Sequence, residues 1–422
     1  MYGILNLPEI TFPDGFIWGS STAGHQVEGE NIHSQNWALE QEGKIKIKSG
    51  KACNHYEMYR DDVKLIKELG HKAYRMSVEW SRVEPVEGEF CKEAVEHYID
   101  LLSRLKDENI KVYVTLHHFT HPLWFEKKGA FHKAENIAYF ERYVNYIVHL
   151  LAEYVDSWNV INEFNLYDGA EPANFKINMI KAHARGYHVI KQYTGAPVST
   201  AHAFIDYFPS RRHERLDNIM TNYMDWMNNE FFFHAIRTGE IMLPQSDMVY
   251  DPEVKGAMDY WSVNYYIRQM VDARKKRPES GKRFEFTQLK LIPMDFPHDE
   301  FFPEGLVTCL ERLKDRPVII TENGCATNDD RFRIAHMILH LYAMKEAIDR
   351  GVDVRGYIHW STMDNYEWGS FVPRFGLVHV DFDTFERTPK PSALFYKDII
   401  ENNGLNAGII GNYLKEIPAV GK

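Results

Sequence analysis

The sequence predicts a single closed (β/α)8 barrel, also called a TIM barrel, that spans residues 1–422. Three observations support this prediction. Short β-rich runs recur eight times, amphipathic stretches separate most of them, and no linker, low-complexity tract or internal repeat divides the chain. Parallel strands joined by helices are covered on the outside, and eight such units close into a barrel without a sheet edge.

The predicted elements follow one another in order along the chain. The β-rich runs cover residues 16–20, 73–78, 112–116, 157–161, 198–203, 260–263, 318–321 and 356–360. The amphipathic stretches cover residues 61–69, 94–105, 137–153, 177–192, 216–236 and 331–348. An open doubly wound sheet would also alternate strands and helices, but its nucleotide-binding form needs a GxGxxG turn after the first strand. Residues 19–24 read GSSTAG, so the closed barrel is favoured.

Charge and composition narrow the function classes. Lys and Arg number 49 against 60 Asp and Glu, a net charge of −11, and no basic run is long enough for a nucleic-acid surface. No window reaches the roughly 18 apolar residues of a membrane span, and the first residues do not resemble a signal peptide. The four cysteines form no CxxC pair. We therefore expect a cytoplasmic protein that binds neither nucleic acid nor a membrane.

Two carboxylates directly follow predicted strands. Glu163 comes after the fourth run and Glu322 after the seventh. The fourth and seventh strands of a closed barrel can face each other across its mouth, where catalytic groups gather. In glycoside cleavage one carboxylic acid protonates the leaving oxygen while another carboxylate attacks the anomeric carbon. By spacing alone, a Glu after a strand is more often a solvated loop residue or half of an ion pair than a catalytic group.

Amides and aromatic residues at the same strand ends favour a sugar pocket. A sugar presents hydroxyls at its rim and C–H groups on its faces, so it needs both hydrogen-bonding and apolar partners. The polar candidates are Gln26, His118, Asn162 and Glu367, and the aromatic candidates are Trp360 and Trp368. Each of them could also be an ordinary packing or turn residue.

Seven motifs occur in order between about residues 12 and 396. They are FIWG at 16–19 with QVEG at 26–29, YRMS at 74–77, TLHH at 115–118, NE at 162–163, NYY at 264–266, TENG at 321–324 and WSTMDNYEW at 360–368. Together they resemble the motifs of glycoside hydrolase family 1, the β-glucosidase and β-galactosidase family. Alone, the NE or TENG string would be a weak signal.

The resemblance implies a role for each matching residue. Glu163 would be the general acid/base, Glu322 the nucleophile and Asn162 the amide that holds the 2-hydroxyl of the sugar. Arg75 and Tyr266 would hydrogen-bond the nucleophile, and Asn264 would be a polar support. The implied sugar-binding residues are Gln26, His118, Trp360, Glu367 and Trp368. Phe296 stands near the position where the family often carries a tryptophan on the leaving-group side.

The predicted activity is that of a retaining exo-β-glycosidase without cofactor or metal. It would hydrolyse non-reducing terminal β-D-glycosides of small molecules or oligosaccharides, with β-glucosides expected first and β-galactosides or β-fucosides as further substrates. Three alternatives stay open. These are a 6-phospho-β-glycosidase, which the carboxylate of Glu367 disfavours and Arg374 keeps open; a catalytically inactive sugar-binding barrel; and a metal-dependent hydrolase using His117, His118 and His121.

Overall fold

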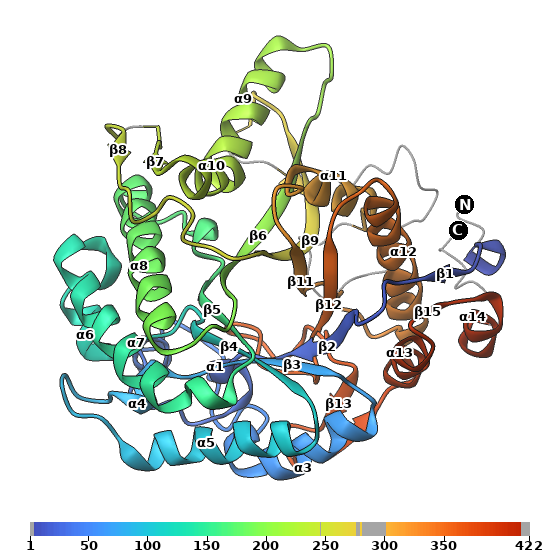
Figure 1. The fold of residues 1–422 in the computed structure, drawn as a ribbon, viewed down its shortest axis with the longest axis horizontal. Coiled ribbons are helices and arrows are strands. Elements are labelled where there is room, and N and C mark those ends of the chain that lie inside the picture. Colours follow the sequence, from blue (N-terminus) through green and yellow to red (C-terminus); the bar gives the residue numbers. More distant parts are fainter. Residues whose placement is uncertain (1–3, 245, 276–278, 281–300, 415–422) are drawn as a thin grey trace.

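Eight parallel strands close into a barrel, and helices surround it (Figure 1). The computed structural model describes residues 4–244, 246–275, 279–280 and 301–414. Around the barrel the strands are β2 (Ile17–Ser21), β3 (Ala73–Ser77), β4 (Lys111–His117), β5 (Ser157–Asn162), β6 (Val198–Pro209), β9 (Trp261–Val271), β11 (Val318–Glu322) and β12 (Val354–Trp360). All neighbouring pairs are parallel, and β12 pairs with β2 to complete the ring. The predicted fold class and all eight predicted strands are confirmed.

Five of the six predicted helices form, although the last two residues predicted for the third, 152 and 153, belong to a separate 3-10 turn. They are α3 (His55–Glu68), α5 (Lys92–Asp107), α7 (Ile137–Leu151), α8 (Pro172–Tyr193) and α12 (Asp330–Asp349). The sixth, predicted over 216–236, is divided into α9 (Arg215–Asp225), a π-helical turn η6 (Trp226–Glu230) and α10 (Phe231–Thr238). Within the turn, the Asn229 side chain donates to Ile205 O at 2.8 Å, so it bonds to the backbone of β6. This tertiary contact accompanies a break that periodicity alone does not predict.

The remaining elements are short or lie near the chain ends. The helices are η1 (Ile4–Asn6), α1 (Gly24–Val27), α2 (Gln35–Gln41), α4 (Trp80–Val83), α6 (Leu123–Lys127), η2 (Ala130–His132), η3 (Ala134–Asn136), η4 (Ala152–Tyr154), η5 (Phe164–Leu166), α11 (Glu304–Arg312), α13 (Pro391–Asn402) and α14 (Ala407–Tyr413). Four antiparallel pairings join β1 (Ile10–Thr11) with β15 (Gly404–Leu405), β7 (Glu240–Ile241) with β8 (Val249–Tyr250), β10 (Glu279–Ser280) with β9, and β13 (Val378–Val380) with β14 (Arg387–Pro389).

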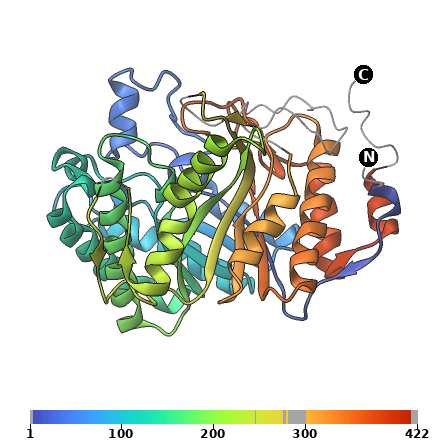
Figure 2. The same ribbon diagram turned by 90° about the horizontal axis from the view of Figure 1, so that it is seen from above.

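Strands β6 and β9 are longer than predicted. Their pairing continues from Ala201 and Ser262 as far as Pro209 and Val271, beyond the barrel ring itself. Figure 2, which views the molecule from the side of α9, shows the two strands side by side behind that helix. The extra length arises because the two strands pair with each other where other barrel strands end.

Two of the buried apolar clusters in the described residues follow from strand alternation. The larger cluster lies between the outer face of the strands and the helices. A small inner layer consists of Ala73, Tyr113, Tyr260, Ile319 and Ile358, with Ile17 packed against it. None of the helices described within residues 4–414 combines the length and hydropathy of a bilayer span.

Candidate active site

Glu163 and Glu322 stand at strand ends, and an irregularity in strand pairing precedes each of them. The pairing of β5 with β6 shifts by one residue between Asn159 and Asn162. The pairing of β11 with β9 shifts by one residue between Ile320 and Glu322. An extra residue in a strand turns the following side chains to the other face. The two shifts therefore redirect the polar groups that end β5 and β11. Glu163 itself has a left-handed φ of 50°.

Glu322 receives two hydrogen bonds in the interior of the protein. Arg75 Nη1 donates to Glu322 Oε1 at 2.5 Å, and the Tyr266 hydroxyl donates to Oε2 at 2.8 Å. A guanidinium and a hydroxyl donor favour the ionised form of a carboxylate. Burial is the main cause, and the negative charge of Glu322 the second, that raises the pKa of Tyr266 well above its ordinary value. Tyr266 therefore keeps its proton and stays a donor.

A chain of amides joins this carboxylate to the second one. Arg75 Nη2 donates to Asn162 Oδ1 at 2.6 Å, and Asn264 Nδ2 donates to the same oxygen at 3.2 Å. The Asn264 amide also donates to Glu163 Oε1 at 2.8 Å, and Thr321 Oγ1 donates to Asn264 Oδ1 at 2.7 Å. Five predicted residues and Thr321, which the sequence reasoning gave no role, thus form one buried network. The position of Thr321 inside the TENG motif is the feature of the sequence that could have indicated its part in the site.

Glu163 is placed to carry a proton at neutral pH. Burial, followed by the negative charge of Glu322, raises the pKa of Glu163 to about 8. The side chain is almost buried, with 8% of its surface exposed. A protonated carboxyl group beside a carboxylate that receives an arginine is an arrangement suited to acid-assisted nucleophilic displacement.

Comparison with known families decides the class of protein. The profile of Glycosyl hydrolase family 1 matches residues 8–405. The chain belongs to glycoside hydrolase family 1. It is 29% identical to the 1,4-beta-D-glucan glucohydrolase of Thermotoga neapolitana, over 93% of this chain and 99% of that protein. It is 28% identical to a beta-galactosidase of Sulfolobus acidocaldarius, over 97% and 99% of the two chains.

A solved relative has the same fold. The beta-glycosidase from Pyrococcus horikoshii superposes with a TM-score of 0.88 at 35% identity, covering 96% of this chain and 98% of that one. The chain is therefore a glycosidase with the barrel of its family, and it acts on small-molecule or oligosaccharide substrates. The predicted family and enzyme class are confirmed.

In this family 1 glycosidase, predicted sugar-binding residues gather beside the carboxylates. The ring of His118 lies nearly parallel to those of Trp360 and Trp368, with centroids 6.1 and 6.3 Å away. His118 Nε2 lies 3.3 Å from the Asn162 amide nitrogen. The charge of Glu367 also acts on Tyr266, the hydroxyl that donates to the nucleophile candidate.

Two of these side chains have polar atoms available for a ligand. Gln26 Nε2 donates to Asn365 Oδ1 and to Tyr366 O, both at 3.0 Å. Gln26 Oε1 and His118 Nδ1 are buried and have no hydrogen-bond partner among the described residues. Burial lowers the pKa of His118 well below its ordinary value, so the imidazole is neutral. A buried polar atom without a partner is unfavourable, and a sugar hydroxyl would satisfy it.

The histidines of the metal hypothesis form a different arrangement. His117 Nε2 lies 3.3 Å from His121 Nδ1, and His121 Nε2 lies 2.9 Å from Glu126 Oε2. His117 packs edge-on against Phe131, as expected for a packing neighbour. The described part of the chain contains no group of three or more His, Cys, Asp or Glu side chains that could hold a metal ion. Phe296, to which the leaving-group expectation refers, lies outside the described residues.

Proposed function

We propose that this enzyme is a retaining exo-β-glycosidase in which Glu322 is the nucleophile and Glu163 the general acid/base. One observation carries the proposal: Glu322 receives hydrogen bonds from Arg75 and Tyr266, while burial and the Glu322 charge raise the pKa of Glu163. The site thus offers an attacking carboxyl group that is held by two hydrogen-bond donors, and a protonated acid, in one buried network.

The reaction proceeds in two displacements. In the first, a Glu322 oxygen bonds to the anomeric carbon, the bond to the leaving oxygen breaks, and Glu163 transfers its proton to that oxygen. In the second, water attacks the anomeric carbon, gives a proton to the Glu163 carboxylate, and Glu322 leaves. Two inversions at one carbon give net retention. Both steps use only the two carboxyl groups and water.

Substrate binding in the proposal depends on the sugar-binding residues described above. Asn162 would hold the 2-hydroxyl, because its amide lies between Arg75 and Asn264 beside both carboxyl groups. The neutral His118 and Gln26 would bond other hydroxyls, and Trp360 and Trp368 would contact the C–H faces of the ring.

We propose β-glucosides as the preferred glycone class, with β-galactosides or β-fucosides also accepted. The relatives include proteins named 1,4-beta-D-glucan glucohydrolase and Beta-galactosidase. Beta-glucosidase from Thermotoga maritima has been solved in complex with glucoimidazole and in complex with galacto-hydroximolactam. Glucose and galactose differ only in the orientation of the 4-hydroxyl, and fucose is galactose without the 6-hydroxyl, so the same side chains can hold most of their hydroxyls.

A neutral glycone fits the charges better than a phosphorylated one. Glu367 is nearly buried, and its carboxylate would repel a phosphate dianion. The guanidinium of Arg374 lies over the ring of Phe382, 4.8 Å from its centroid, and its Nη1 is 4.0 Å from Asp364 Oδ2. Arg374 thus lies between a buried carboxylate and an aromatic ring, but its Nη1 has no hydrogen-bond partner among the described residues. The argument against a phosphorylated glycone therefore depends on Glu367.

The proposal is tested with a substrate panel and a stereochemical measurement. Nitrophenol release is measured from β-linked glucoside, galactoside, fucoside, mannoside and 6-phosphoglucoside, with Glu322→Gln as the blank. The expected result is activity on a neutral glycoside that the variant lacks, with the β-anomer appearing first by proton NMR. Activity only on the phosphorylated substrate would overturn the neutral glycone. An α-anomer formed first would overturn retention, and an inactive wild type would favour a sugar-binding role.

A further inference from the structure

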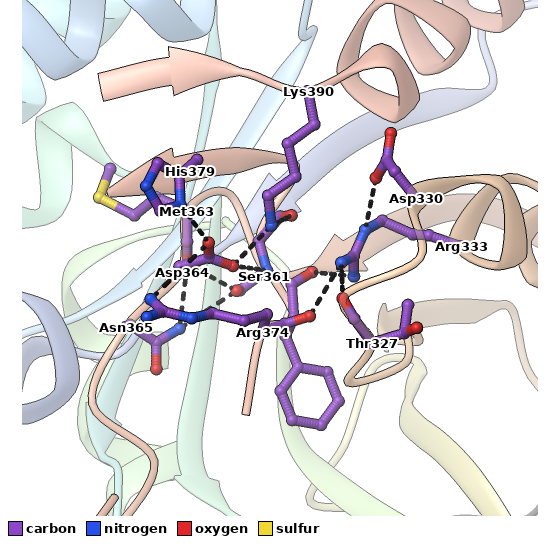
Figure 3. Close-up of polar contacts among 12 residues, drawn as sticks. Thr327, Asp330, Arg333, Ser361, Met363, Asp364, Asn365, Arg374, His379 and Lys390 are labelled. Carbon is purple, nitrogen blue, oxygen red and sulfur yellow. Dashed lines mark hydrogen bonds and ion pairs between the residues drawn. The ribbon is translucent and has the colours of Figure 1, made fainter. Parts of the chain in front are cut away.

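Two loops at the mouth of the barrel are joined by a buried polar cluster (Figure 3). The first, which we call the sugar loop, is residues 361–376 between β12 and β13, and it carries Glu367 and Trp368. The second, the nucleophile loop, is residues 323–329 between Glu322 and α12. The predicted sugar-binding groups Glu367 and Trp368 thus lie in an irregular segment, whereas Glu322 is held by the pairing of β11 with β9 and is followed directly by the nucleophile loop.

Arg333, on α12, donates hydrogen bonds to both loops. Its Nη1 donates to Cys325 O at 2.8 Å and to Phe375 O at 3.1 Å. Its Nη2 donates to Thr327 O at 2.7 Å and to Arg374 O at 2.9 Å. Each terminal nitrogen therefore bridges one carbonyl of the nucleophile loop and one of the sugar loop.

The remaining N–H of Arg333 goes to the carboxylate of Asp330. Arg333 Nε donates to Asp330 Oδ1 at 3.0 Å. Asp330 also accepts from Ser392 Oγ at 2.7 Å, so α12 is tied to the start of α13 at this point. A guanidinium has five N–H donors, and here all five have partners, with the side chain only 1% exposed. A lysine ammonium has neither the number of donors nor the fork geometry to replace it.

Asp364 closes the base of the sugar loop from its other side. Its fully buried Oδ1 accepts from Lys390 Nζ at 2.7 Å and from Gly376 N at 3.0 Å. Its Oδ2 lies 3.3 Å from His379 Nδ1 and 4.0 Å from Arg374 Nη1. Lys390 Nζ donates to Gly376 O as well, at 2.7 Å. The start of the sugar loop, at Asp364, and its end, at Gly376, are therefore bonded to each other and to the ammonium of Lys390.

The backbone contact at this base leaves no space for a side chain. A Cβ added at Gly376 would stand 2.0 Å from Asp364 N, so only glycine allows the two strands of the loop to approach this closely. Asp364 N donates to Val378 O at 2.9 Å, and Leu377 N donates to Ser361 O at 3.0 Å. Glu367 and Trp368 lie in the segment that projects between these fixed ends.

We propose that Arg333 and Asp364 are positioning residues for recognition of the glycone. They hold the base of the sugar loop against the nucleophile loop, so that Glu367 and Trp368 meet the sugar at a fixed distance from Glu322. The inference rests on the proposed function, because it assigns Glu367 and Trp368 to sugar binding. Neither Arg333 nor Asp364 needs to touch the substrate in this role.

The test compares two substrates that differ by one group. Wild type, Arg333→Lys and Asp364→Asn are assayed with nitrophenyl β-glucoside and with nitrophenyl β-xyloside, which lacks the hydroxymethyl group that the proposal assigns to the sugar loop. Active enzyme is counted by titration with dinitrophenyl 2-deoxy-2-fluoro-β-glucoside, so misfolded protein does not enter the rates. Arg355→Lys is the matched control, because Arg355 is exposed, pairs with Asp353 and lies near the start of β12.

We expect both variants to lower the glucoside-to-xyloside ratio of kcat/KM by about tenfold, chiefly through KM for the glucoside, while Arg355→Lys leaves the ratio unchanged. A general loss of stability would lower the unfolding temperature and the active fraction without changing this ratio. A ratio within twofold of wild type in the folded variants would overturn the positioning role. If Arg333→Lys fails to fold, the near-isosteric Asp364→Asn decides alone. A wild type that cleaves neither substrate would overturn the proposed function, and the inference with it.

Discussion

The two ends of the barrel interior differ, although the same strands build both. At one end, Ala73, Ile319 and Ile358 belong to a small apolar layer. Two or three residues further along the same strands stand Arg75, Glu322 and Trp360. The first end gains free energy from apolar burial, whereas the second buries charges whose desolvation is offset only by their partners. The comparison shows that only two or three residues of one strand separate a side chain that stabilises the fold from a side chain of the site.

The largest effect should come from removing the attacking group. Glu322→Gln is expected to lower kcat/KM by about 10⁴-fold or more, because an amide is a poor nucleophile. Nitrophenyl glycoside hydrolysis measures the loss, and circular dichroism checks that the variant is folded. The control Glu89→Gln changes an exposed carboxylate and should stay within twofold of wild type. More than 1% residual activity in Glu322→Gln would contradict the assignment.

A smaller loss of activity is expected when Arg75 keeps its positive charge but loses the two-pronged geometry of its guanidinium. Arg75→Lys should lower kcat/KM by about 10²- to 10³-fold, because an ammonium cannot bond Glu322 and Asn162 in the fork geometry of Arg75. Arg104→Lys is the matched control, since Arg104 pairs with Asp100 at the surface. Equal activities of the two variants would mean that the guanidinium geometry has no catalytic role.

A substitution in the inner apolar layer, in contrast, should affect stability and leave activity nearly unchanged. Ile358 is fully buried, so Ile358→Ala should lower the free energy of unfolding by about 2–4 kcal/mol, with kcat/KM within about threefold of wild type. Denaturant unfolding and steady-state kinetics measure the two effects. Leu394→Ala, at a side chain with 48% exposure, should change stability by less than about 0.5 kcal/mol. A large activity loss in Ile358→Ala would contradict the separation between the apolar layer and the site.

The wild-type enzyme itself should have a pH profile that changes on one side only, by about tenfold per pH unit. Because burial and the charge of Glu322 raise the pKa of Glu163 to about 8, the acid stays protonated through neutral pH, and kcat/KM should fall as pH rises above about 8. For a substrate with a good leaving group, Glu163→Gln should abolish this basic limb.

In Glu322→Gln, the pKa of Glu163 should be lower, as measured by carbon NMR, because the neighbouring negative charge is gone. An unchanged limb in Glu163→Gln would assign it to another group.

The carboxylates and most of their neighbours could be predicted because each lies in a local string at the end of a β-rich run. Glu163, Asn264 and Tyr266 were located in this way, although their catalytic roles stay a proposal. Arg333 and Lys390 could not be found, because an arginine on an amphipathic helix and a lysine before a proline look like ordinary surface residues. Asp364 lay inside a motif without an assigned role. Their importance depends on contacts with backbone carbonyls and side chains many residues away.

Strand and helix periodicity in the sequence determined the barrel itself, because burying one face of each element leaves few arrangements for eight alternating units. Only the tertiary structure decided the direction of the site residues. The irregularities before Asn162 and Glu322 turn side chains that alternation would place on the other face. It also decided the lengths of β6 and β9 and the break in the helix between α9 and α10. These features arise from pairing between distant segments, and no local pattern records such pairing.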